Sequence, residues 1–205
     1  MYEYQILTIG HLPPEGFFEE TENQPFPGAG CTSTLLRGYL NILVDPSLPP
    51  DEMEKLLFNC SALGQKDIDV VFVTHGHEDH IAGIEHFQRA RWFIDRAELE
   101  VMKQSADERL LALAKKFEPC GPNTSTELIA GLKFIPFPGH TPGSTGIVFN
   151  SPGGQNGSLR VCIAGDAVMT RDRFDQASPA NQKIAGLADI VVPGHDNYFF
   201  TKPHS

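Results

Sequence analysis

The stretch Val70–His80, VVFVTHGHEDH, joins an apolar run to a dense group of metal-binding side chains. Val70–Val73 has the composition of a buried β-strand, and the side chains that follow it are His75, His77, Asp79 and His80. Imidazoles and carboxylates at this density are costly in an unliganded core, whereas a metal ion converts the same groups into ligands. Gly76 permits a tight turn, so that alternate side chains can converge. The stretch therefore predicts a metal site at the end of a strand.

Three later stretches place a His or an Asp directly after a strand-like run. They are FPGH, which ends at His140, AGD, which ends at Asp166, and VVPGH, which ends at His195. Each of these short motifs is weak alone, but together they supply two more imidazoles and another carboxylate. Imidazole and carboxylate without thiolate suit Zn²⁺, and Fe, Mn or Co are also compatible with them.

In this order, the motifs resemble the signature of the metallo-β-lactamase superfamily, and the resemblance runs from Asn41–Pro46 to Tyr198. It implies an α/β fold, an αββα sandwich of two mixed β-sheets flanked by helices, with two divalent metal ions at one edge. In that arrangement the first metal is held by His75, His77 and His140, and the second by Asp79, His80 and His195. Asp166 bridges both.

The resemblance also implies a hydrolytic mechanism. Two divalent ions about 3.5–4 Å apart can carry a bridging water as hydroxide near neutral pH, and that hydroxide is the expected nucleophile. Asp79 is the expected catalytic residue, which orients the hydroxide and receives its proton. With an Asp at position 166, the chain resembles the thioesterases, lactonases and RNA-processing members of the family more than its antibiotic-degrading enzymes.

Composition limits the partners and the location of the protein. The 205 residues include 16 Lys and Arg against 26 Asp and Glu, a net charge of −10, and no basic stripe of the kind that holds a phosphate backbone. We expect a single domain over residues 1–205, a small-molecule substrate rather than nucleic acid, and no membrane span, since no apolar run approaches about 18 residues. The N-terminus has no signal-peptide pattern, so a cytoplasmic location with four free thiols is expected.

The remaining pattern predicts strands that alternate with helices. Strand-like runs fall at Glu3–Ile9, Cys31–Arg37, Asn41–Asp45, Asp69–Thr74, Arg91–Ile94, Leu132–Pro136, Thr145–Asn150, Arg160–Ala164 and Asp189–Val192. Helices are expected at Asp51–Leu63, Arg96–Gln104, Asp107–Phe117 and Ala177–Ala185.

Three functions fit these observations. The first is hydrolysis of a small ester, thioester or lactone, with an apolar lip from Phe17, Phe18 and Phe26 beside the site. The second is a phosphodiesterase or endoribonuclease that uses the same metals, and its only local basic support is Arg171 and Arg173. The third is a non-catalytic metal-binding module, which seven intact ligands argue against.

Four further residues have two interpretations each. Thr141 and Ser144 either orient metal ligands or form a simple turn. Asp45 either supports a ligand or caps the following turn. Tyr198 either places a phenol near the substrate oxygen or is a packed aromatic. The sequence leaves the substrate, the metal in the cell and the oligomeric state open.

Overall fold

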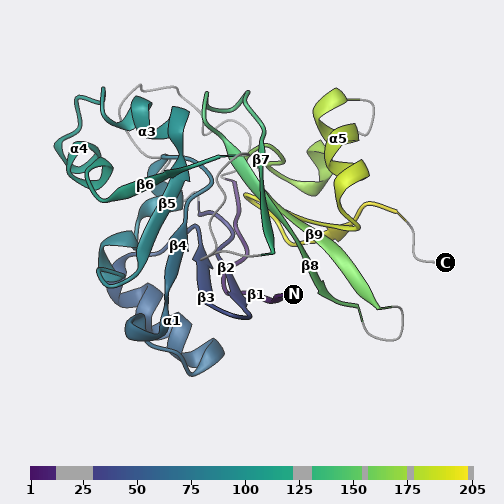
Figure 1. The fold of residues 1–205 in the computed structure, drawn as a ribbon, viewed down its shortest axis with the longest axis horizontal. Coiled ribbons are helices and arrows are strands. Elements are labelled where there is room, and N and C mark those ends of the chain that lie inside the picture. Colours follow the sequence, from purple (N-terminus) through teal and green to yellow (C-terminus); the bar gives the residue numbers. More distant parts are fainter. Residues whose placement is uncertain (13–29, 122–130, 154–156, 175–177, 203–205) are drawn as a thin grey trace.

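A computed structural model describes residues 1–12, 30–121, 131–153, 157–174 and 178–202, and in these ranges the strands form two mixed sheets (Figure 1). The first sheet has the order β1-β2-β3-β4-β5-β6, with strands at Glu3–Ile6, Thr34–Arg37, Asn41–Val44, Val70–Phe72, Arg91–Asp95 and Phe117–Cys120. The second has the order β11-β10-β9-β8-β7, with strands, from β7 to β11, at Leu132–Pro136, Thr145–Pro152, Ser158–Gly165, Ile190–Pro193 and Phe199–Phe200. The neighbouring strands from β3 through β6 pair in parallel, as do β9 and β10. The remaining pairs are antiparallel.

Helices cover the outer face of each sheet. Figure 1 shows α1, α3 and α4 on the side of the first sheet and α5 on the side of the second. The helices are α1 (Pro50–Ser61), α2 (Glu78–Ile81), α3 (Arg96–Met102), α4 (Glu108–Ala114) and α5 (Pro179–Leu187). Asp95 and Asp107 begin α3 and α4 as N-caps, because their carboxylates accept hydrogen bonds from free backbone N–H groups. None of these helices, within the described ranges, is long and apolar enough to cross a bilayer.

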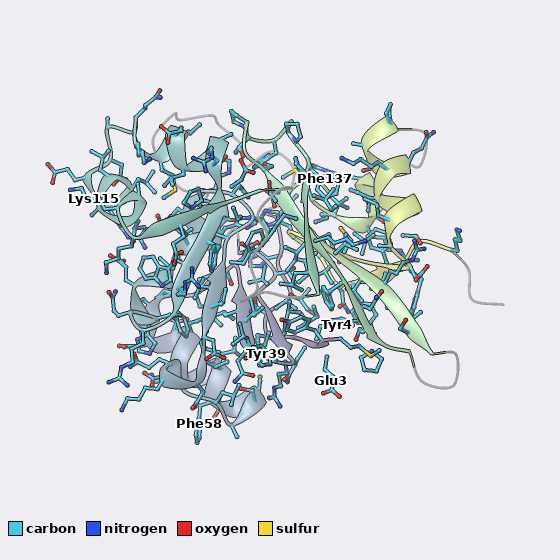
Figure 2. All side chains as sticks on the ribbon, in the orientation of Figure 1. Glu3, Tyr4, Tyr39, Phe58, Lys115 and Phe137 are labelled. Atoms are coloured by element: carbon cyan, nitrogen blue, oxygen red, sulfur yellow. The ribbon has the colours of Figure 1, made fainter. Side chains whose placement is uncertain are left out.

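The alternation of side chains along each strand separates three apolar layers, which fill the space between the ribbons (Figure 2). In β4 and the residue after it, Val71 and Val73 pack toward α1 and α3, whereas Val70 and Phe72 pack toward the other sheet. In the second sheet, Val148, Cys162 and Val191 pack with Ile184 of α5. The chain therefore forms the αββα sandwich that the resemblance implies.

Some boundaries differ from the sequence-based expectation. The helix expected over Asp107–Phe117 ends at Ala114, and Phe117 begins β6, which pairs in parallel with β5 at the sheet edge. An edge strand tolerates Pro119 in its middle, and this proline conceals the strand in the sequence. The short elements α2 and β11 were not expected either; the former begins directly after His77.

The topology brings the expected ligands to one edge of the sandwich. The carboxyl ends of parallel strands meet at the same edge. In the first sheet, Asp45 directly follows β3, and His75 comes three residues after the end of β4. In the second sheet, Asp166 directly follows β9, and His195 comes two residues after the end of β10. The two sheets are also joined here, since Thr145 N donates to Thr74 O over 3.0 Å and Thr32 N donates to Gly194 O over 2.7 Å.

Candidate metal centre

Three histidines converge on one point at this edge. His75 and His77 lie in the turn after β4, and His140 lies in the connection between β7 and β8 of the other sheet. His77 Nδ1 is 3.0 Å from His75 Nε2 and 3.0 Å from His140 Nε2. Three ring nitrogens this close form a cluster that can hold one metal ion. We call these residues the three-His cluster.

A second cluster lies beside it and contains Asp79, His80 and His195. Asp79 and His80 are in α2, and His195 follows β10. Asp79 Oδ2 is 3.9 Å from His80 Nε2 and 3.7 Å from His195 Nε2. His195 is oriented by its other ring nitrogen, because Nδ1 is 3.1 Å from Gly30 O and Nε2 therefore faces the cluster.

Asp166 lies between the two clusters. Its Oδ2 is 3.2 Å from both His140 Nε2 and His195 Nε2, and its Oδ1 is 3.2 Å from His80 Nε2. One carboxylate thus touches a member of each cluster. The structure therefore brings together all seven residues that the resemblance assigns to metal binding.

Unpaired buried atoms show that the residues fit metal ions. His80 Nε2 and Asp166 Oδ1 are both buried, and neither has a hydrogen-bond partner among the described residues. A buried polar atom without a partner costs free energy of about 1–3 kcal/mol, and coordination to a cation removes that cost. Two such atoms 3.2 Å apart, both of metal-ligand type, fit a divalent ion in this centre.

The electrostatics agree with this assignment. Burial lowers the pKa of His75 well below its ordinary value and also lowers the pKa of His77, so both imidazoles stay neutral, the form that binds metal. Burial lowers the pKa of His195 as well, but the contact with Asp166 outweighs it and leaves that pKa raised. A place that stabilises a proton between these two groups also favours a divalent cation.

Asp45 orients His80 and is the support for a ligand that one of its two interpretations anticipated. Its Oδ2 is 2.9 Å from His80 Nδ1 and accepts a hydrogen bond of 2.8 Å from Thr74 Oγ1, while its Oδ1 accepts from Thr74 N. The backbone of Asp45 has φ 50°, in the left-handed region that Asp tolerates better than most residues. Burial raises the pKa of the neighbouring Cys31 thiol to about 12, so this sulfur stays protonated in the metal-free protein.

Glu98 is a part of the site that the sequence did not reveal. It lies in α3, its residue is only 2% exposed, and its carboxylate accepts hydrogen bonds from both loops of the three-His cluster. The donors are Gly76 N, Thr141 Oγ1 and Gly143 N. Its neighbours in the sequence, DRAELEVM, are those of an ordinary surface helix, so no local pattern signals this role.

The other expected residues have varied positions. Thr141 and Ser144 form a turn, as one of their two interpretations expected, and their hydroxyls are bonded to each other over 2.7 Å. Tyr198 packs edge to face on Tyr4 at 6.1 Å between centroids, as a packed aromatic does. Tyr4 and Tyr198 line an open groove of about 530 Å³, and Glu3 and Pro152 also line it. The expected lip of Phe17, Phe18 and Phe26 lies outside the described residues.

Two β-sheets between helices, with a His and Asp cluster at one edge, are the architecture of a class of metal-dependent hydrolases. The family model described as the metallo-beta-lactamase superfamily matches residues 27–195, and the chain belongs to this superfamily. Its members are metal-dependent hydrolases, and this protein is one of them.

Relatives of this chain agree with the family. It is 26% identical to metallo-beta-lactamase domain-containing protein 1 of Xenopus laevis over 206 residues, which cover 95% of this chain and 82% of that protein. It is 28% identical to a probable metallo-hydrolase of Methanocaldococcus jannaschii over 134 residues, or 60% of this chain and 65% of that protein.

Solved structures show the same fold. A putative metallo-beta-lactamase from Thermotoga maritima superposes with a TM-score of 0.76 at 19% identity, covering 97% of this chain and 99% of that one. The dizinc quorum-quenching lactonase AidC, in complex with a product, superposes with a TM-score of 0.67 at 20% identity, covering 86% of this chain and 76% of the lactonase.

Proposed function

We propose that this protein is a dinuclear metal-dependent hydrolase of a small ester, thioester or lactone. The observation that carries the proposal is the position of Asp166, whose two oxygens each lie 3.2 Å from ring nitrogens of histidines in the adjoining clusters. In the proposed site, one ion is held by His75, His77 and His140, and the other by Asp79, His80 and His195. Zn²⁺ suits these ligands, and Fe or Mn is compatible with them.

Two divalent ions in this centre would supply an activated water and would polarise the substrate oxygen that gains charge. The residues of the chain would orient the reactants and move the proton. The side chain of Asp79 is 22% exposed, whereas that of Asp166 is 4% exposed. A proton acceptor must be within reach of the water that it deprotonates, so the greater exposure of Asp79 favours it for this role and the burial of Asp166 favours bridging.

Charge supports a small substrate. The net charge of −10 resists a long polyanion, while a dimetal centre attracts a single anionic group or the carbonyl oxygen that gains negative charge during ester hydrolysis. The likeness to the lactonase AidC adds support at the level of the fold, because a lactone ring presents a single electrophilic carbonyl group to a nucleophile.

Metal analysis followed by turnover of a substrate panel tests the proposal. The panel contains a thioester, a series of lactones, a simple ester and bis-p-nitrophenyl phosphate. We expect two divalent ions per chain and turnover of a carboxylic ester or thioester that Asp79→Ala reduces by about 100-fold or more. Asp51→Ala, at an exposed carboxylate in α1 on the outer side of the first sheet, is the matched control and retains turnover. Metal-replete protein that turns over none of these compounds would support the non-catalytic module instead.

A phosphodiesterase or endoribonuclease remains the second candidate, and two contacts favour it. Arg171 N donates to Asp196 Oδ2 over 3.1 Å, and His195 N donates to Met169 O over 2.7 Å, so the segment with the exposed Arg171 and Arg173 is held against the His195 loop. Phosphodiester turnover that is lost in the double variant Arg171→Ala, Arg173→Ala would establish this candidate. Ester turnover that is indifferent to the same change would establish the first.

A further inference from the structure

The buried carboxylate of Glu98 joins two loops that belong to different sheets. Its Oε1 accepts a hydrogen bond of 2.9 Å from Gly76 N, between His75 and His77 in the turn after β4. Its Oε2 accepts bonds of 2.7 Å from Thr141 Oγ1 and 3.1 Å from Gly143 N, in the connection that carries His140. Every histidine of the three-His cluster is therefore next in sequence to a residue that donates to Glu98. That residue is Gly76 for His75 and His77, and Thr141 for His140.

The contacts around Glu98 leave little freedom to these loops. A Cβ on Gly143 would lie 2.1 Å from Glu98 N, so the loop backbone packs directly on the start of α3. Ser144 Oγ accepts from Thr141 N over 3.0 Å and lies 2.7 Å from Thr141 Oγ1, which in turn donates to Glu98. The hydroxyls thus form a short chain that ends on the carboxylate and fixes the direction in which His140 leaves the loop.

We propose that Glu98 is a positioning residue that holds the turn of His75 and His77 at the distance from His140 that one metal ion requires. Glu98 touches no ligand nitrogen; it acts through three donors on the loops. The inference rests on the proposed function, since it assigns Glu98 to the metal site formed by the three-His cluster. Groups that orient metal ligands typically change metal affinity by about 10- to 100-fold when they are removed.

Glu98→Gln is the variant that tests this role, because it keeps the size of the side chain but faces an N–H or O–H donor with its own NH₂ group. Zn²⁺ affinity is measured by competition with a chelator in two backgrounds. His195→Ala leaves the three-His cluster, and His77→Ala leaves the cluster of Asp79, His80 and His195. We expect Glu98→Gln to weaken Zn²⁺ binding about 10- to 100-fold in the first background and less than about 2-fold in the second.

Glu118→Gln is the matched control. Glu118 is an exposed carboxylate that pairs with Arg91 on the same sheet, so its loss leaves both Zn²⁺ affinities unchanged. Equal weakening in both backgrounds by Glu98→Gln, or no weakening in either, would overturn the inference. Wild-type protein that binds no Zn²⁺ would overturn the proposed function together with it, so the two failures are distinct.

Thr141 provides a second test if Glu98→Gln does not fold. Thr141→Val removes one donor to Glu98 at constant shape, and Thr141→Ser keeps that donor. We expect Val to weaken Zn²⁺ binding in the His195→Ala background and Ser to restore it. A similar loss with Ser and with Val would show that the hydroxyl is not what matters and would overturn the inference.

Discussion

Gly194 offers a direct way to disturb the centre without changing any proposed ligand. It precedes His195, and its N–H donates to both Gly165 O and Val168 O over 3.0 Å. A Cβ at this position would lie 2.0 Å from Asp166 Oδ1, a buried atom that has no hydrogen-bond partner among the described residues. Gly194→Ala therefore pushes a methyl group into the carboxylate between the two clusters.

The size of the effect follows from this distance. Ordinary contact begins at 3.4 Å, so Asp166 or the His195 loop must move by about 3.4 − 2.0 = 1.4 Å. Metal and catalytic sites require their groups within about 0.5 Å of the productive position, and a misplacement of about 1 Å costs about 100-fold in rate. We expect Gly194→Ala to lose at least one of the two metal ions and to reduce turnover by about 100-fold or more.

The assay is metal content per chain after dialysis, measured with turnover of the best substrate and with thermal melting. Gly186→Ala is the control, because a Cβ there meets nothing within 4 Å and the residue lies in α5. The same substitution at that site should leave metal content unchanged and stabilise the helix by up to about 1 kcal/mol. If Gly194→Ala keeps two ions and full turnover, then Asp166 does not lie where the structure places it.

Three further predictions concern the whole molecule. Removal of metal by a chelator should lower the melting temperature, since ligands from separate segments are tied together, and reconstitution should restore it; an unchanged value after verified removal would contradict the metal assignment. One fast-reacting thiol is expected at pH 8 in native protein, and four after denaturation. Cys60 is exposed, whereas burial raises the pKa of the other three thiols to about 12 (Cys31, Cys120 and Cys162). Cys60→Ser should therefore abolish the fast reaction. Phe72→Ala should cost about 3–5 kcal/mol of unfolding free energy in a denaturant titration, since this ring packs on Phe134 between the sheets. Tyr39 is 84% exposed, so Tyr39→Ala should change that free energy by no more than about 0.5 kcal/mol. Similar losses in both variants would argue against the layer assignment.

The proposed ligands were predictable because their signals are local. Each follows a strand, and the pattern of strand, glycine and His or Asp survives in a single sequence even without knowledge of the pairing. Asp45 was half predictable: its place after a strand was visible, but only the structure distinguishes a support for His80 from a turn cap. The end of α4 was mispredicted because Phe117 fits the apolar face of a helix as well as the edge strand that it begins.

Glu98 was not predictable for the opposite reason. Its partners are 22 to 45 residues away along the chain, and two of the three are backbone N–H groups, which carry no side-chain identity. A glutamate between Ala97 and Leu99 has the composition of a solvent-facing position in an amphipathic helix. Only the docking of the second sheet turns that position into an interior one.

The seam between the sheets also determines when metal can act during folding. His77 and His140 are 63 residues apart and belong to loops on opposite sheets, so their cluster does not exist until the two halves have docked. Interactions that form after the folding transition state leave the folding rate unchanged and slow unfolding. Metal ions would therefore slow the unfolding of the docked sandwich and lengthen the lifetime of the native state. The folding rate would depend on the apolar layers instead.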